Sequence, residues 1–329
     1  MRVVHYQRKR RKNANFSLEF IFQDVRKRLS DRCHIEVRYA PFYSNGFLRR
    51  LAIALDAGRS RAGVTHVTGD INFAILGVQH HNALLTILDC GFLNRPRRLQ
   101  RTILKKFWVD WPVRRARRIT TISECVKGEI IALTGCPAEK IHVIPVAISE
   151  GFLPAPALFN SVAPRILHVG TALNKNLRRV IEAVRGIECT LVIIGEIGTD
   201  VVESLRSNGV CYENHIELSE PEVIGQYERC DMLCFPSTYE GFGMPILEAQ
   251  AVGRPVVTSN CSTMPEVAGN AACFVDPLQV DSIRSGIQRV IRDGEFRERL
   301  VRDGFINVKR FDAERIAQQY YEVYKLMIS

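Results

Sequence analysis

Two carboxylates, Glu240 and Glu248, stand with seven residues between them in the segment 235–257, which reads FPSTYEGFGMPILEAQAVGRPVV. The segment is typical of a strand end, a glycine-containing turn and the first turns of a helix, with Glu240 on the turn and Glu248 in the helix. Gly241 and Gly243 allow the turn to approach a ligand closely, and N–H groups at a helix N-terminus attract anions. We therefore predict a diphosphate site in which Glu248 accepts hydrogen bonds from sugar hydroxyls and Glu240 points toward the group that the diphosphate carries.

For Glu248 alone, a solvated acid stabilised by the helix dipole is the better interpretation, and only the whole stretch favours a ligand site. Pro245 is predicted at the first helical position, where proline is tolerated. The N–H groups from Phe242 to Ile246 are predicted to face the diphosphate.

The elements that must position these residues are short β-branched runs that alternate with longer amphipathic ones. The strand candidates are 1–6, 34–40, 65–68, 84–89, 118–123 and 142–148 in the first half, and 165–170, 190–195, 210–214, 232–237, 255–260 and 272–276 in the second. Such alternation predicts parallel sheets covered by helices. Ligands of such sheets bind beyond the carboxyl ends of the strands, which is where the quoted turn would lie.

The chain organisation predicts an α/β protein with two Rossmann-like, doubly wound domains facing a cleft. We expect an N-terminal domain over 1–152, a proline-containing linker over 153–165 and a second domain over 166–310. The last segment, 311–329, has helical periodicity and is expected to form a helix that packs back toward the N-terminal domain.

Composition narrows the class of protein. The 329 residues carry a formal charge of +10, which suits an anionic partner such as a phosphorylated substrate, a nucleic acid or an anionic lipid surface. The ten cysteines include no C-x2-C pair, so we expect reduced thiols in a cytoplasmic protein. The basic start is followed by no apolar signal region, and no apolar run reaches the roughly 18 residues of a membrane span. We therefore expect a cytoplasmic protein that can lie peripherally on the inner face of a membrane.

The stretch 95–118 concentrates ten Lys and Arg residues with a single acid, Asp110, and interleaves Phe107, Trp108 and Trp111. Basic residues with tryptophans suit contact with anionic lipid headgroups, and we predict such a contact here. They also suit a nucleic-acid face, but that interpretation rests on charge alone, so we expect no nucleic-acid partner. A solvated helix whose aromatic side chains pack inward remains an equal alternative.

The E-x7-E pair resembles the signature of the retaining glycosyltransferases of family 4, which have the GT-B fold. The resemblance is strengthened by three further segments in the same order, 166–177, 191–196 and 251–277, and extends more weakly to 120–130 and 142–152. It implies transfer of a sugar from a nucleoside-diphosphate donor with retention of configuration. Relatives of this kind are often mannosyltransferases of polysaccharide or lipopolysaccharide assembly. The expected partners are therefore a GDP- or UDP-sugar, with GDP-mannose favoured, and a glycan or polyprenyl-diphosphate-linked acceptor.

The resemblance also implies roles for individual residues. Lys175 matches a lysine that neutralises the donor diphosphate, Glu248 the acid that holds the ribose, and Glu240 the group that meets the donor sugar. The implied donor-binding residues are Gly170, Lys175, Glu240, Phe242, Gly243, Met244, Pro245, Ile246 and Glu248; the implied catalytic residues are Glu240 and Asp89; and Ser17, Glu19 and Ser123 are acceptor-side candidates. Such enzymes hold the diphosphate without a metal, and this chain has no D-x-D motif. We expect no metal site and no cofactor.

The sequence departs from the family at Leu88, where the family often has a histidine before the aspartate that Asp89 matches. That histidine meets the donor sugar in the family. The departure leaves an alternative open, a catalytically silent scaffold of the same fold that binds sugar nucleotides.

Overall fold

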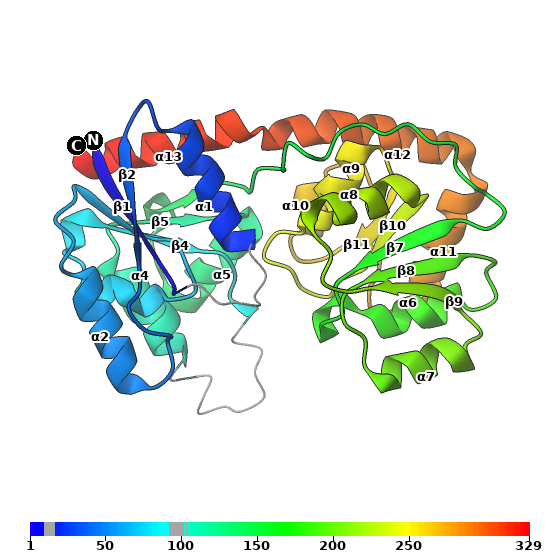
Figure 1. Ribbon diagram of the computed structural model, residues 1–329, viewed down its shortest axis with the longest axis horizontal. Coiled ribbons are helices and arrows are strands. Elements are labelled where there is room, and N and C mark those ends of the chain that lie inside the picture. The colour runs from blue at the N-terminus through cyan, green and yellow to red at the C-terminus, as the bar shows by residue number, and fades with distance from the viewer. Residues whose placement is uncertain (10–16, 92–101, 103) are drawn as a thin grey trace. The chain divides into compact units, whose positions relative to one another are not determined.

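The computed structural model describes residues 1–9, 17–91, 102 and 104–329 and divides the chain into two compact units (Figure 1). Unit 1 comprises Met1–Ala147 together with Asp312–Ser329, and unit 2 comprises Ile148–Phe311. The segment 153–165, which we expected to be a linker, packs on unit 2 up to Pro164. There the N–H of Ala155 donates to the carbonyl of Val252 at 3.1 Å.

Unit 1 contains a parallel sheet with the strand order β2-β1-β3-β4-β5-β6. Its strands are β1 (Arg2–Gln7), β2 (His34–Tyr39), β3 (Val64–Val67), β4 (Ala83–Ile87), β5 (Arg118–Thr121) and β6 (Ile141–Val143). Its helices are α1 (Ser17–Arg28), α2 (Phe47–Ala57), α4 (Trp111–Arg115), α5 (Glu124–Thr134) and α13 (Ala313–Ile328), with the shorter helices η1 (Asn72–Gly77), η2 (His80–Asn82), η4 (Lys106–Asp110) and η5 (Ala138–Lys140).

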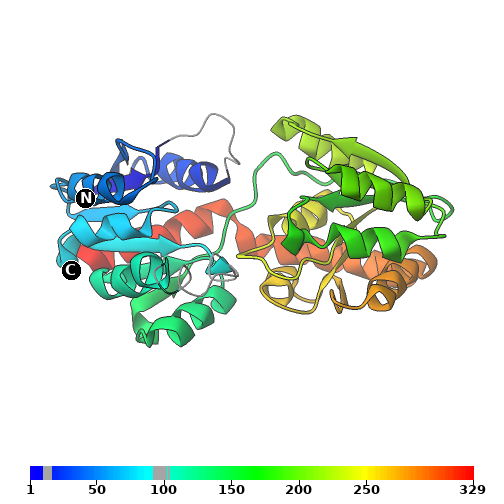
Figure 2. The same cartoon turned by 90° about the horizontal axis from the view of Figure 1, so that it is seen from below.

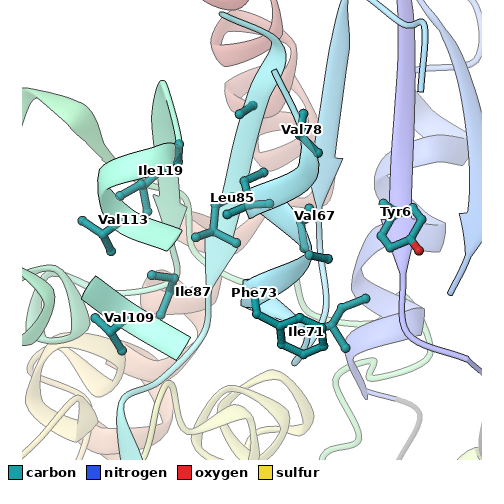
Figure 3. Packing of buried hydrophobic residues seen from close by; sticks show 14 of the residues in the cluster. Tyr6, Val67, Ile71, Phe73, Val78, Leu85, Ile87, Val109, Val113 and Ile119 are labelled. Carbon is teal, nitrogen blue, oxygen red and sulfur yellow. The ribbon is translucent and has the colours of Figure 1, made fainter. Parts of the chain in front are cut away.

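The core of unit 1 forms where the sheet meets the helices on one of its faces. Tyr6 of β1 and Leu85 of β4 share a buried cluster with Phe73 of η1 and Val109 of η4 (Figure 3). Every residue of β3 and of β4 is buried. A parallel sheet covered on both faces requires this, and it agrees with the absence of Asp, Glu, Lys and Arg from both strands.

Helix α13, the red helix of unit 1 in Figure 2, packs against α1 and β3 and brings Tyr324 into the interior. The Tyr324 hydroxyl lies 2.8 Å from Nε2 of His5 and 3.0 Å from Nδ1 of His66, and all three residues are fully buried. Burial lowers the pKa of His66 to about 3 and that of His5 well below its ordinary value. Both imidazoles are therefore neutral at neutral pH, and their hydrogen bonds attach the end of the chain to unit 1.

Tyr324→Phe is expected to destabilise unit 1 by about 1–3 kcal/mol, because it leaves buried ring nitrogens of His5 and His66 without the hydroxyl. Urea unfolding at pH 7 measures the loss. Tyr321→Phe is the matched control on the same helix, since no hydrogen bond of the Tyr321 hydroxyl occurs among the described residues. Equal stability of the Tyr324 variant and the control would show that this hydroxyl does not hold the helix.

Unit 2 contains a parallel sheet with the order β12-β11-β10-β7-β8-β9. Its strands are β7 (Arg165–Val169), β8 (Thr190–Ile194), β9 (Cys211–His215), β10 (Met232–Phe235), β11 (Val256–Ser259) and β12 (Cys273–Val275). Its helices are α6 (Leu177–Val184), α7 (Thr199–Ser207), α8 (Glu220–Arg229), α9 (Met244–Val252), α10 (Met264–Ala268), α11 (Val280–Arg292) and α12 (Gly294–Asn307), with η6 (Leu173–Lys175) and η7 (Val308–Phe311). Figure 1 shows α8, α9 and α10 on one face of the sheet and α6 and α7 on the other.

The strand order of unit 2 reverses between β7 and β10, which are neighbours in the sheet although two strands lie between them in the chain. In doubly wound sheets the loops that leave the carboxyl ends of two such strands run to opposite faces, and ligands bind at this point. The predicted α/β class is confirmed in both units, and each of the twelve predicted strand segments overlaps an observed strand.

No helix in the described part of the chain combines the length and the apolar character needed to cross a bilayer.

Candidate functional site

Two loops meet where the strand order of unit 2 reverses. The lysine loop, residues 170–176, follows β7, and the glutamate loop, residues 236–243, follows β10. The side chain of Asn174 donates to the carbonyl of Tyr239 at 2.9 Å, and the N–H of Thr238 donates to the carbonyl of Asn174 at 2.8 Å. These bonds tie the two loops together.

Asn176 completes the connection. Its backbone is left-handed (φ 66°), a conformation that asparagine tolerates better than most residues, and its side chain is buried. The amide nitrogen donates to the carbonyls of Pro236 at 3.0 Å and Pro277 at 2.7 Å. The two asparagines of the Asn-Lys-Asn sequence therefore hold Lys175 in place from both sides, a role that the sequence analysis missed.

Lys175 and Glu240 form an ion pair at the junction of the two loops. Nζ of Lys175 lies 2.7 Å from Oε1 of Glu240 and 4.8 Å from the centre of the Phe235 ring. The two charged side chains are only 21% and 13% exposed, so the pair is shielded from water on most sides. The structure thus brings together two predicted site residues that are 65 positions apart in the chain.

Gly170 provides the space for Lys175. Its φ of 90° lies in the region that favours glycine, and a Cβ atom there would stand 3.0 Å from Cε and 3.1 Å from Cγ of Lys175. Any other residue would strain the backbone and displace the lysine stem. The predicted site residue Gly170 therefore acts, in this structure, on the position of Lys175.

The turn that carries Glu240 is supported by Ser262 and Thr263, which follow β11. The Glu240 N–H donates to Oγ of Ser262 at 3.2 Å, and that hydroxyl in turn donates to the Glu240 carbonyl at 3.0 Å. The fully buried hydroxyl of Thr263 donates to the carbonyl of Phe242 at 2.7 Å. The sequence analysis missed both residues, because only the neighbouring positions of β10 and β11 bring them to the turn.

Helix α9 begins one residue earlier than expected. Met244 is its first residue and Pro245 its second, which corrects the predicted first position of the proline. Pro245 has no N–H, and the N–H of Ile246 donates to the carbonyl of Gly243 at 3.0 Å. Of the N–H groups that we predicted to face the diphosphate, those of Phe242, Gly243 and Met244 are therefore left as candidates. No described side chain caps this helix N-terminus.

Glu248 lies in the second turn of α9, and its Oε2 accepts a hydrogen bond from the hydroxyl of Tyr227 at 2.5 Å. Tyr227 belongs to α8 and is fully buried. Burial raises the pKa of Glu248 to about 7, and the charge of Glu220 adds to the rise, while Tyr227 and Lys175 oppose it. The carboxylate is thus held at a free-energy cost that a ligand with hydroxyl donors would reduce.

Glu248→Gln is expected to stabilise the protein above about pH 7 and to leave its stability unchanged near pH 4. The folded pKa of about 7 exceeds the ordinary value of 4.5, so the cost is absent below 4.5, grows up to pH 7 and is complete above it. We expect a gain of about 1–3 kcal/mol at pH 8 from the size of the pKa difference. Urea unfolding at both pH values checks this, with the exposed Glu203→Gln on α7 as control. No gain at pH 8 would contradict the raised pKa of this partly buried carboxyl group.

The surroundings of the predicted site residues in unit 1 say less about their roles. Asp89 is exposed, and its Oδ1 accepts the N–H of Gly91 at 2.9 Å. Together with Leu88 it lines a pocket of about 400 Å³, which also includes Arg50 and Trp108. Pocket and aspartate lie beyond the carboxyl end of β4, where ligands of such sheets bind.

The acceptor-side candidates have different surroundings. Ser123 is fully buried, and its hydroxyl caps α5 by accepting the N–H of Val126 at 3.1 Å. Ser17 and Glu19 lie in the first turn of α1, and their side chains fall outside the described part of the structure.

Part of the basic stretch 95–118, residues 95–101 and 103, lies outside the described residues. In its described part, Arg115 donates to the carbonyl of Val78 at 2.7 Å and Arg117 to that of Met327 at 2.6 Å. The Trp108 ring packs against Phe73, with 5.1 Å between ring centres. These side chains bond or pack within unit 1, as the inward-packing alternative predicts, whereas Trp111 is 41% exposed.

Comparison with known proteins agrees with the fold. Residues 152–305 match the family described as glycosyl transferases group 1, a range that contains Lys175, Glu240 and Glu248. The O-antigen chain mannosyltransferase B of Escherichia coli is 30% identical over 235 residues, which cover 64% of this chain and 61% of the relative. The chain spans about three fifths of the length of the curated relatives that it matches first, 61% and 58% of them.

Solved structures share the architecture at low identity. Sucrose-phosphate synthase from Thermosynechococcus elongatus superposes with a TM-score of 0.79 at 14% identity, covering 99% of both chains. Anabaena Alr3699/HepE in complex with UDP and glucose gives a TM-score of 0.75 at 17% identity, also over 99% of both chains. The fold of this protein is therefore that of the GT-B glycosyltransferases.

Proposed function

We propose that this protein is a retaining, metal-independent glycosyltransferase of family 4. In this proposal it transfers a sugar, mannose in our preferred version, from a nucleoside-diphosphate donor to a glycan or polyprenyl-diphosphate-linked acceptor. The observation that carries the proposal is the ion pair of Lys175 and Glu240, 2.7 Å apart at the strand-order reversal of unit 2. One cation and one carboxylate, each held by its own loop, match the two charges that develop when a glycosyl diphosphate breaks.

Lys175 is assigned to the diphosphate. The leaving group gains negative charge as the bond to the sugar breaks, and an ammonium group fixed beforehand stabilises that charge without reorganisation. The N–H groups of Phe242, Gly243 and Met244 at the start of α9 add positive potential on the same side. Together these groups serve as the counter-charge that a metal supplies in enzymes with a D-x-D motif, which this chain lacks.

Glu248 is assigned to the nucleoside. Its Oε2 accepts a hydrogen bond from Tyr227, and in this proposal its Oε1 accepts hydrogen bonds from the ribose hydroxyls. Because hydroxyl donors favour the charged form of a carboxyl group, binding should lower the raised pKa of Glu248.

The donor sugar and the acceptor rest on similarity. The O-antigen mannosyltransferase from Escherichia coli supports a mannosyl donor and a glycan acceptor. The Alr3699/HepE complex with UDP and glucose supports a nucleoside-diphosphate sugar as the ligand of this fold. A polyprenyl-linked acceptor would place the protein peripherally on the cytoplasmic face of a membrane.

Thermal unfolding in the presence of GDP, UDP, ADP and their sugars tests the donor. A ligand that binds only the folded state raises Tm, so one nucleoside diphosphate should stabilise the protein more than the others. Transfer from the sugar of that nucleotide, measured with and without EDTA, tests the chemistry. We expect unchanged transfer in EDTA, whereas activity lost in EDTA and restored by Mn²⁺ would contradict metal independence.

One observation favours a second candidate, the catalytically silent scaffold. Leu88 lines the pocket of unit 1 beside Asp89, so no imidazole stands at the position where the family often has one. The two candidates differ in a single measurement. Stabilisation by a nucleotide sugar without release of nucleoside diphosphate in the presence of acceptor would favour the scaffold.

A further inference from the structure

Helix α2 (Phe47–Ala57) exposes an apolar face. Phe47, Leu48, Leu51 and Leu55 are between 47% and 78% exposed, and no described residue covers them. A surface helix of a water-soluble domain normally presents polar residues outward. Figure 1 shows α2 at the periphery of unit 1.

The opposite face of α2 packs against the core of unit 1, so the exposed apolar face is not needed to attach the helix. Ile53 and Ala57 point inward and are completely buried. A Cβ atom on Gly77 of η1 would come within 1.8 Å of the Ala54 carbonyl, so the helix packs on unit 1 by close backbone contact. At about 100° per residue, the four exposed apolar side chains fall within an arc of roughly 100° on the opposite side.

The surroundings of this face are basic. Residues 37–55 contain no Asp or Glu, and the exposed Arg49, Arg59 and Arg61 lie on α2 or within four residues of its end. The first acid that follows, Asp56, is already paired with Arg38 at 2.7 Å. The charge on this face therefore complements an anionic surface.

Aromatic residues extend the face beyond the helix. Phe42 and Tyr43, in the loop before α2, are 46% and 43% exposed, and Nζ of Lys9 lies 5.1 Å from the centre of the Tyr43 ring. Aromatic rings beside cations are typical of surfaces that lie at the boundary between headgroups and acyl chains. We call Phe42, Tyr43 and the four apolar residues of α2 the α2 face.

We propose that the α2 face inserts into the interfacial region of an anionic lipid bilayer. The apolar side chains enter the acyl boundary, while Arg49, Arg59 and Arg61 remain at headgroup level and contact phosphates. On its inner edge the same helix directs Arg50 to the pocket that contains Asp89, so a bilayer at the α2 face lies next to that pocket. This surface differs from the stretch 95–118, whose described arginines Arg115 and Arg117 bond to backbone carbonyls.

Sedimentation with vesicles of phosphatidylcholine alone, or of phosphatidylcholine with phosphatidylglycerol, tests the proposal without donor or acceptor. Its outcome is therefore separate from that of the proposed function. We expect binding to the anionic vesicles, weakened by salt, and little binding to the neutral ones. The combined variant Leu48→Gln, Leu51→Gln and Leu55→Gln should lower the partition coefficient by roughly 10-fold or more. Changing Arg49, Arg59 and Arg61 to Gln should lower it by about fivefold per arginine.

The matched control replaces three exposed leucines of unit 2, Leu153, Leu158 and Leu278, with glutamine. This control should bind as the parent does, and unchanged thermal unfolding of all variants should show that they remain folded. Three results would overturn the proposal. The first is that the parent does not bind anionic vesicles. The second is that the Lys105→Gln/Lys106→Gln variant loses binding while the leucine variant of α2 still binds. The third is a concentration-dependent dimer that the leucine variant of α2 abolishes. The last result would assign the α2 face to a second copy of the chain.

Discussion

Glu240→Gln is expected to lower kcat by roughly 100-fold or more while leaving the affinity for nucleoside diphosphate undiminished. Positive charge grows at the anomeric carbon as the diphosphate leaves, and a carboxylate fixed on a rigid turn stabilises that charge. Ser262 and Thr263 hold the turn in place, so the amide should occupy the same position without the charge. The affinity should not fall, because the lost carboxylate competes with the diphosphate for Lys175.

Single-turnover kinetics and calorimetric titration with the nucleoside diphosphate separate these two effects. Ser262→Ala is a useful companion variant, since it loosens the turn and retains the charge. Its kcat should lie between those of the parent and Glu240→Gln. A Glu240→Gln protein with normal kcat and weakened nucleotide binding would show that the roles of Glu240 and Glu248 are reversed. A loss of neither would favour the silent scaffold.

Lys175→Met is expected to weaken nucleoside-diphosphate binding by about 1.5–3 kcal/mol, or roughly 10- to 150-fold in Kd, the range for a hydrogen bond to a charged group. Methionine retains the apolar stem that lies over Gly170 and Phe235, so the loop geometry should survive. The variant also removes the partner of Glu240, and repulsion between that carboxylate and the diphosphate adds to the loss.

Arg178→Met is the control for this experiment. Arg178 lies three positions along the chain on α6, is more than half exposed and pairs with Asp200. General loss of positive charge near the site would weaken binding in both variants, whereas a specific role for Lys175 weakens it in one. Equal Kd values for the parent and Lys175→Met would mean that this lysine does not meet the diphosphate.

The two variants also test each other. Because Lys175 and Glu240 are in contact, their effects on nucleotide affinity should not add, and the double variant should bind more tightly than the sum of single effects predicts. Additive effects would indicate that the ion pair does not persist in solution.

The local sequence determined much of this protein. Strands and helices follow from patterns a few residues long, so the approximate positions of all twelve strands could be predicted from short β-branched runs. The relation of Glu240 to Glu248 is also local, since a turn followed by two helical turns separates them in any fold. The start of α9 was wrong by one residue, because proline is tolerated at the second helical position as well as the first.

Only the tertiary structure decided which distant residues meet. Alternation of strands and helices predicts parallel sheets but not the strand order, and it is the neighbouring placement of β7 and β10 that brings Lys175 to Glu240. The supports of the site, Asn176 and Ser262, depend on the same order. The contact of Tyr324 with His5, 319 positions apart, has no local signal at all.

Which side chains are exposed to solvent could not be predicted from the sequence either. Composition directed attention to 95–118, but charge and aromatic content do not reveal whether an arginine faces water or a backbone carbonyl, as Arg115 does. Helix α2 has more apolar residues than one buried face can hold, and it packs against unit 1 on only one side. Packing of Ile53 and Ala57 against unit 1 decided which side that is and left Leu48 and Leu51 outside, because the sheet and η1 offer a single surface to the helix.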